Sequence, residues 1–243
     1  MKALEWQIAT VKAIKPETAN VKTLTITLPG WMAHRAGQHY DVRLTAEDGY
    51  SAQRSYSIAS EPERSGEIDI TVERIRDGEV SSYLDDAVVV GDRFEVRGPI
   101  GGYFVWEAQD GGPLLLVAGG SGVVPLMAML RHRAASGAST PARLLYSSRS
   151  LDDVIYREEL NRLSGRGFEV FHTLTRSQPA GWQGYARRID DAMIAEVGRS
   201  FGASALVYIC GPTALVENAA DAAERAGIPL QRIRTERFGP TGT

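Results

Sequence analysis

The sequence predicts a two-domain fold, a small antiparallel β-barrel followed by an α/β domain with a parallel sheet. The first half contains short segments in which apolar and polar residues alternate, as expected for half-buried strands. In the second half, apolar runs alternate with helical segments, which is typical of a parallel sheet covered on both faces. A polar stretch at 107–112 separates the two patterns. We therefore expect domains at residues 1–108 and 109–243.

Six strands are predicted in the first half, with turn residues such as Pro29-Gly30 and Asp48-Gly49 between them. The clearest alternation sets Ile68, Ile70 and Val72 against polar neighbours. A helix is expected to interrupt the strands at Ser81–Val88. Short strands at this spacing indicate a barrel. They are Trp6–Ala13, Val21–Leu28, Tyr40–Thr45, Arg54–Ala59, Glu67–Ile75 and Arg93–Arg97.

The second half is predicted to alternate strand and helix throughout. In an open parallel sheet the ligand binds beyond the carboxyl ends of the strands, so residues that follow each strand are candidates for binding. The predicted elements, in order, are Leu114–Ala118, Val123–Ala135, Arg143–Tyr146, Asp152–Leu163, Phe168–Thr173, Ile189–Val197, Leu206–Cys210, Ala214–Ala226 and Arg232–Thr235.

Composition narrows the class of protein. The chain has 43% hydrophobic and 23% charged residues and a net charge of −3, so we expect neither a nucleic-acid nor a membrane partner. One cysteine excludes a disulfide framework and an iron–sulfur cluster held by this chain alone. The four histidines are scattered, and no metal site is predicted. The expected location is the cytoplasm.

A glycine-rich turn is the main chemical signal. It comprises Gly119, Gly120, Ser121 and Gly122, and it lies between a buried apolar run and a helix with Pro125 in its first turn. Glycines let an anion approach the backbone, and the free N–H groups at a helix start attract it. The spacing is a variant of the dinucleotide fingerprint; the alternative is a tight strand–helix turn.

Three stretches of the first half could contact a ligand. Arg54 and Tyr56 share one strand face, which suits a ligand with a phosphate and a planar ring; the alternative is a surface cross-strand pair. Gly78–Leu84 offers N–H and hydroxyl donors at a helix start, or an ordinary serine N-cap. Gly98–Phe104 is either a loop around a ligand or the exit from the barrel.

In order, these motifs resemble the ferredoxin–NADP reductase family of flavoproteins, in its bacterial form without an iron–sulfur domain. The resemblance covers about residues 6–238. It rests on Arg54-x-Tyr56-Ser57, Gly78-x-Val80-Ser81, Gly98-Pro99-x-Gly101, the glycine turn with Pro125, and Cys210-Gly211-Pro212. It implies a six-stranded barrel that holds FAD, with FMN as the weaker alternative. A five-stranded parallel sheet would bind the nicotinamide dinucleotide.

The resemblance also implies roles for the flavin-side residues. Arg54 would bind the flavin diphosphate, Tyr56 would stack on the isoalloxazine, and Ser57 would lie near its N5. Further donors to the diphosphate would come from the helix start after Gly78, namely Val80, Ser81 and Ser82. Arg74 is a weaker candidate for contact with the flavin ring.

On the dinucleotide side, the resemblance places Cys210 beside the nicotinamide C4 and Glu236 close to the flavin, with Phe238 covering one aromatic ring. An NAD site usually has an acidic residue at the end of the second strand. Here we find Ser148 and Arg149, and Thr175 and Arg176 follow the third strand. Arginine suits a 2′-phosphate, so NADPH is preferred over NADH, and Tyr185 and Arg187 could complete the pocket.

The predicted activity is transfer of hydride from the nicotinamide to FAD, with Tyr56, Ser57, Cys210 and Glu236 at the reacting rings. Electrons then pass to a separate acceptor protein, which is a ferredoxin, a flavodoxin, or a component of an oxygenase or molybdoenzyme. One alternative is an NAD(P)H:flavin reductase that releases reduced flavin. Another is a flavin-binding electron-transfer subunit of a complex without dinucleotide oxidation of its own.

Overall fold

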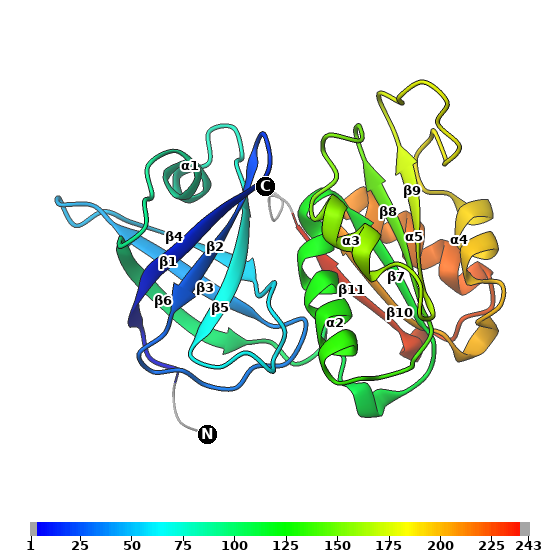
Figure 1. Cartoon of the computed structure of the whole chain (residues 1–243), viewed down its shortest axis with the longest axis horizontal. Coiled ribbons are helices and arrows are strands. Elements are labelled where there is room, and N and C mark those ends of the chain that lie inside the picture. Colours follow the sequence, from blue (N-terminus) through cyan, green and yellow to red (C-terminus); the bar gives the residue numbers. More distant parts are fainter. Residues whose placement is uncertain (1–3, 239–243) are drawn as a thin grey trace. The chain divides into compact units, whose positions relative to one another are not determined.

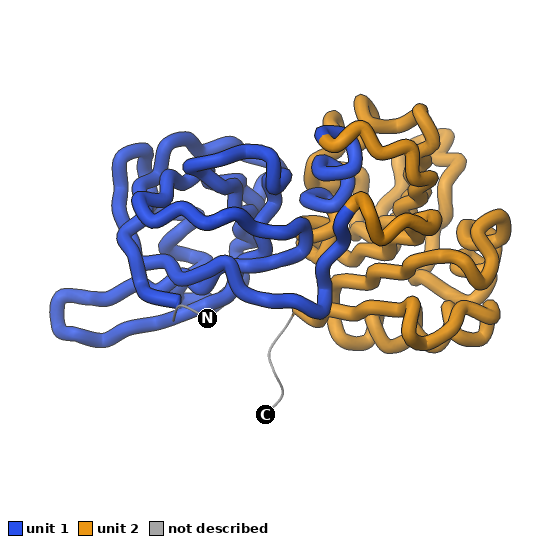
Figure 2. Tube along the Cα trace, turned by 90° about the horizontal axis from the view of Figure 1, so that it is seen from below, with its two compact units in different colours: residues 1–107, 127–135 blue, residues 108–126, 136–243 orange. Residues whose placement is uncertain are grey.

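The computed structural model describes residues 4–238. The chain divides into two compact units, residues 1–107 with 127–135 and residues 108–126 with 136–243 (Figure 2). Among the described residues, no helix combines the length and the apolar character needed to cross a bilayer.

The first unit is built on a six-stranded antiparallel sheet in the order β4-β3-β6-β1-β2-β5 (Figure 1). The inward faces of the strands form one apolar core. A bridge between Ile58 and Ile70 joins the continuation of β4 to β5, so the two edge strands meet and the sheet curls into a barrel. The strands are β1 (Gln7–Thr18), β2 (Val21–Thr27), β3 (His39–Thr45), β4 (Ser51–Ser57), β5 (Glu67–Glu73) and β6 (Arg93–Ile100).

A short helix, α1 (Glu79–Asp86), packs against both edge strands, β4 and β5. Its Val80 and Leu84 are buried in the barrel core. The helix begins two residues earlier than the sequence predicted because Gly78 serves as its N-cap. The N–H of Ser82 already donates to the carbonyl of Gly78.

The second unit is a five-stranded parallel sheet in the order β11-β10-β7-β8-β9. The chain runs outward through β7, β8 and β9 and then returns to place β10 on the other side of β7. The strand order therefore reverses between β7 and β10, where open parallel sheets bind ligands. The strands are β7 (Leu114–Gly119), β8 (Ala142–Ser148), β9 (Phe168–Leu174), β10 (Leu206–Gly211) and β11 (Ile233–Arg237).

Four helices connect these strands: α2 (Val123–Ala135), α3 (Arg157–Leu163), α4 (Asp191–Gly198) and α5 (Thr213–Arg225). Apolar side chains of α4 and α5 form a core with one face of the sheet. The observed architecture confirms the predicted fold class: a six-stranded antiparallel barrel followed by an α/β domain with a five-stranded parallel sheet.

One helix is shorter than predicted. The sequence placed a helix at Asp152–Leu163, but α3 begins only at Arg157. Val154 and Ile155 are buried in a loop, and Tyr156 has the left-handed φ of 59°, which an α-helix does not continue through. The apolar residues there fill the core from a loop, and their spacing alone could not show this.

Candidate functional site

The glycine turn lies where the strand order reverses. Gly120–Gly122 forms a 3₁₀ turn between β7 and α2. A Cβ at Gly122 would lie 2.2 Å from the carbonyl oxygen of Cys210, and one at Gly119 would lie 2.6 Å from Leu215. The loops after β7 and β10 are thus in backbone contact, and only glycine fits between them.

Cys210 and Glu236 are paired at the ends of neighbouring strands. They are register partners in β10 and β11, and the Cys210 thiol lies 4.0 Å from a Glu236 carboxylate oxygen. Burial raises the pKa of Glu236 to about 7. Burial, with the nearby Glu236, also raises the pKa of Cys210, so the thiol is neutral near pH 7. The N–H of Phe238 donates to the carbonyl of Gly211 at 2.8 Å, which fixes the chain after β11 beside this pair.

The predicted ribose-binding residues come together at the ends of β8 and β9. The N–H of Thr175 donates to the Ser148 carbonyl, and the N–H of Arg176 donates to the Arg149 carbonyl, both at 2.9 Å. Arg149 and Arg176 are not buried, and within residues 4–238 neither forms an ion pair. The Ser148 hydroxyl is buried without a hydrogen-bond partner in the same range. This edge therefore holds two cations without a carboxylate partner and an unsatisfied hydroxyl.

Tyr185 and Arg187 lie beside the end of β9 and also contact α4 or its N-cap. Tyr185 is bridged to Thr173 of β9. Burial, together with a hydrogen bond to Glu196 of α4, raises the pKa of the Tyr185 phenol to about 12. Arg187 forms an ion pair of 2.6 Å with Asp190, the N-cap of α4. Both side chains thus stabilise the approach to α4.

In the first unit, the predicted flavin-binding residues Arg54 and Tyr56 lie on one face of β4. Arg54 and Tyr56 are opposite Val42 and Tyr40 of β3, whose side chains are buried, so both lie on the same face of the sheet as these two residues. Tyr56 packs against the barrel core, and burial raises its pKa. Arg54 is exposed, and no ion pair of its guanidinium occurs within the described part of the chain. Ser57, buried, follows at the strand's end.

The start of α1 provides backbone donors. The Ser81 hydroxyl accepts from the N–H of Ile75 at 3.2 Å and donates to Gly78, so it closes the loop before the helix. The Ser82 N–H also donates to Gly78. The N–H groups of the first helical turn, including that of Val80, have no hydrogen-bond acceptor within the helix. They are therefore available to bind an anion. A Cβ at Gly78 would lie 2.5 Å from the Ser81 hydroxyl.

Arg74, the weaker flavin candidate, is paired with the other end of α1. Its Nε lies 3.0 Å from a carboxylate oxygen of Asp86. Both side chains are about half exposed, so the pair contributes little stability.

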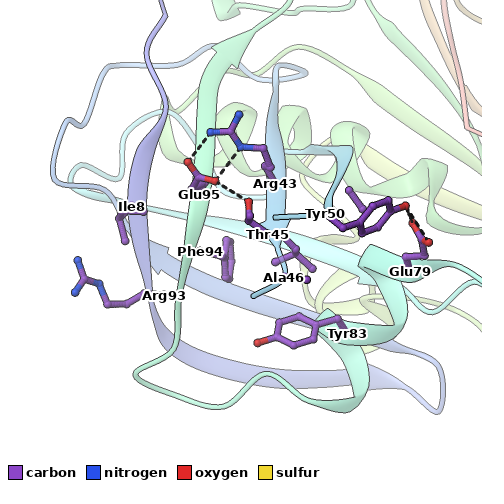
Figure 3. Close-up of a pocket in the computed structure, with 12 residues that line it drawn as sticks. Ile8, Arg43, Thr45, Ala46, Tyr50, Glu79, Tyr83, Arg93, Phe94 and Glu95 are labelled. Carbon is purple, nitrogen blue, oxygen red and sulfur yellow. Dashed lines mark hydrogen bonds and ion pairs between the residues drawn. The ribbon is translucent and has the colours of Figure 1, made fainter. Parts of the chain in front are cut away.

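A pocket of about 420 Å³ is lined by residues of β3, β6, the β3–β4 hairpin and α1 (Figure 3). It includes Ala52, which shares a face with Arg54 and Tyr56, and the aromatic side chains of Tyr50 and Tyr83. The Tyr50 hydroxyl donates to the Glu79 carboxylate at 3.0 Å, so the β3–β4 hairpin is tied to the start of α1.

Sequence reasoning missed Tyr50 and Tyr146. Tyr50 follows a turn and carried no periodic signal. Tyr146 ends an apolar run, where an aromatic residue predicts only burial. Its hydroxyl, however, donates to the carbonyl of Gly120 in the glycine turn at 3.1 Å.

Two known protein families match this chain, one in its first half and one in its second half. Residues 8–105 match the oxidoreductase FAD-binding domain, and residues 116–221 match the oxidoreductase NAD-binding domain. These two domains define an oxidoreductase that binds FAD and a nicotinamide dinucleotide. The chain belongs to the ferredoxin–NADP reductase family of such flavoproteins.

Curated relatives cover nearly the whole chain. The reductase component of propane 2-monooxygenase from Mycolicibacterium goodii is 29% identical over 238 residues, which are 94% of this chain and 66% of the relative. The glycine betaine monooxygenase reductase subunit of Pseudomonas aeruginosa is 30% identical over 239 residues, 95% of this chain and 63% of the relative. The chain thus spans slightly less than two thirds of their length.

Solved structures share the fold. The Amycolatopsis cytochrome P450 reductase GcoB superposes with a TM-score of 0.84 at 26% identity, covering 98% of this chain and 71% of that one. A ferredoxin NADP⁺ reductase from Neisseria gonorrhoeae, bound to FAD and NADP, gives a TM-score of 0.80 at 20% identity, covering 96% and 98%.

The residues present fit both cofactors. On the flavin side, a guanidinium without a carboxylate partner, a half-buried aromatic ring and free N–H groups at a helix start are the donor set of a flavin with a diphosphate. On the dinucleotide side, the glycine turn lies at the point of strand reversal and leads into the start of α2, where free N–H groups attract an anion, and two such arginines follow β8 and β9.

We predict that Glu236→Gln flattens the pH dependence of stability between pH 5 and 8. A carboxyl whose pKa is raised in the folded state stabilises that state fully below its unfolded pKa, and this stabilisation is lost as pH rises through about 7. The free energy of unfolding should therefore fall by about 3 kcal/mol at most in the wild type. Denaturant unfolding at pH 5, 6.5 and 8 measures the effect, and Glu217→Gln on the exposed face of α5 is the control. A slope equal to that of the wild type would contradict the assignment.

Proposed function

We propose that the chain is an FAD-dependent NAD(P)H reductase that delivers electrons to a separate oxygenase component. The observation that carries this proposal is the presence of an FAD-binding and an NAD-binding oxidoreductase domain in one chain. The oxygenase acceptor is favoured because the relatives from M. goodii and P. aeruginosa are reductase parts of monooxygenases. A ferredoxin or flavodoxin is the alternative acceptor. The proposed domain boundary is 108/109 and the proposed location is the cytoplasm.

When both are bound, the nicotinamide supplies a hydride, and the flavin accepts it and passes the electrons on. The chain's residues bind and orient. Tyr56 offers a flat ring, Arg54 balances diphosphate charge, and Ser57 offers a hydroxyl at the end of β4. In the second unit the buried Cys210 and the partly buried Glu236 lie at the ends of β10 and β11. A neutral thiol there excludes water and presents no competing nucleophile.

The pocket beside Arg54 supports FAD over FMN. Positions 56, 54 and 52 lie on one face of β4, and Tyr50 follows in the hairpin. At about 3.3 Å per residue, the path from Tyr56 to Tyr50 is roughly 20 Å long. We place the flavin ring at Tyr56, the diphosphate at Arg54, and the adenosine in the pocket with Tyr50 and Tyr83.

NADPH is the proposed coenzyme. The support is the pair of arginines without carboxylate partners, Arg149 and Arg176, and the absence of an acidic residue at the end of β8. A guanidinium binds a phosphate through charge-assisted hydrogen bonds, and an NAD site would offer a carboxylate to the ribose instead.

Anaerobic titration of the purified flavoprotein with NADPH tests the proposed activity. We expect the flavin absorbance to bleach at about one equivalent, because one hydride reduces one flavin. Bleaching by NADH alone would contradict only the coenzyme preference. A flavin that neither coenzyme reduces would overturn the function. Flavin that leaves the protein on gel filtration after reduction would favour the flavin reductase alternative.

We expect Tyr83→Ala to weaken FAD binding about tenfold and to leave FMN binding unchanged, because only FAD carries an adenine. Stacking of a base on an aromatic ring contributes about 1–3 kcal/mol. Tyr83→Phe keeps the ring and should bind FAD as the wild type does. Quenching of flavin fluorescence on the apoprotein measures each affinity. An equal loss for FAD and FMN would place the adenosine elsewhere.

Arg149→Ala and Arg176→Ala should each raise the KM for NADPH about tenfold and leave the KM for NADH within a factor of two. Each variant removes one charge-assisted contact with the 2′-phosphate. Steady-state kinetics with an artificial acceptor gives both values. Arg199→Ala, at the exposed end of α4, is the matched control. If the KM for NADH rises equally, the arginines do not read the 2′-phosphate.

A further inference from the structure

The hydroxyl of Tyr146 joins two loops of the second unit. Tyr146 lies on β8, fully buried, in register with Ala118 at the end of β7. Its hydroxyl donates to the carbonyl of Gly120 at 3.1 Å and accepts from the N–H of Ile155 at 3.3 Å. One side chain therefore contacts both the glycine turn after β7 and the loop between β8 and α3.

The bond to Gly120 fixes the direction of a peptide unit. In a planar trans peptide the C=O and the N–H point in opposite directions. The Gly120 carbonyl accepts both the Tyr146 hydroxyl and the N–H of Val123. Held in this way, the Gly120–Ser121 peptide directs the Ser121 N–H away from the ring. Gly120 has a φ of +55°, and glycine tolerates alternative backbone conformations better than other residues do. A half-turn of this peptide would break the bond to the phenol.

The direction of this peptide matters for an anion. An N–H group attracts a phosphate, whereas a carbonyl oxygen in its place would repel it. The second bond anchors Ile155, which belongs to the loop that begins with Arg149. The same hydroxyl thus holds the peptide of the glycine turn and the loop that carries a guanidinium available to a phosphate.

We propose that Tyr146 is a positioning residue for the dinucleotide, which orients the Gly120–Ser121 peptide toward the diphosphate and ties it to the loop after β8. This rests on the proposed function, because it requires the dinucleotide to bind at the glycine turn. Tyr146 acts through Gly120 and Ile155. Its loss therefore changes affinity and leaves the hydride step intact once the coenzyme is bound.

The test is Tyr146→Phe in the full chain with its flavin. Phenylalanine keeps the buried ring and removes only the hydroxyl. Isothermal titration with NADP⁺ and with ADP-ribose should show about tenfold weaker binding of both, since both carry the diphosphate. Flavin reduction at saturating NADPH, followed by stopped flow, should change less than twofold.

Tyr208→Phe is the matched control. Tyr208 is also fully buried, lies on β10 of the same sheet, and accepts a hydrogen bond of 3.0 Å from Arg234. It should bind both probes as the wild type does. Gly120→Ala strains the same peptide without altering the ring, because Gly120 has a φ of +55°, so it should also weaken the binding of both probes.

The outcomes separate the two proposals. If the wild type binds neither probe, the proposed function fails. If the wild type binds and Tyr146→Phe binds equally well, only the role of Tyr146 is overturned. An equal loss in Tyr208→Phe, or a lower saturated rate at unchanged affinity, would also overturn it.

Discussion

The close backbone contact between the ends of β7 and β10 constrains the whole second unit. The strand order reverses between them, so no helix crosses directly from one to the other, and their loops can meet. They meet through Gly122 and the carbonyl of Cys210, at a separation that no Cβ would allow. This contact sets the position of the glycine turn, and the turn in turn sets the start of α2. On the other side of β10, the buried Cys210 is in register with the partly buried Glu236 of β11.

In the first unit, side-chain hydrogen bonds fix the loop that precedes α1. An anion site at the start of α1 needs free N–H groups, yet the loop before the helix must still be closed. The Ser81 hydroxyl does this by accepting from Ile75 and donating to Gly78. Because a side chain closes the loop, the N–H groups of the first turn are not used for that purpose. The Ser81 hydroxyl therefore stabilises the loop, and the backbone N–H groups of the first turn are the groups that can bind an anion.

The fold was predictable from local patterns because burial is periodic. Alternation at Ile68–Val72 and the apolar run before Gly119 reflect which faces are buried, and the structure confirms both. The early start of α1 and the late start of α3 were not predictable, because a glycine cap and a left-handed Tyr156 depend on tertiary packing. Likewise, a sequence shows that Tyr146 is apolar enough for a core, but not that its hydroxyl reaches Gly120. Such a contact depends on the turn's backbone path, which has no signature of its own.

The sequence alone also does not show which arginines form ion pairs, because that depends on their neighbours in the fold. Arg74 and Arg187 have carboxylate partners, Asp86 at the end of α1 and Asp190 at the N-cap of α4. Arg54, Arg149 and Arg176 form no ion pair within residues 4–238, although carboxylates are abundant in this acidic chain. A cation without a carboxylate partner at the end of a strand, beside free N–H groups, contributes more to an incoming phosphate than to folding, because its attraction is not already satisfied. The structure thus divides these arginines by their neighbours, and Arg54, Arg149 and Arg176 lie on or directly after strands.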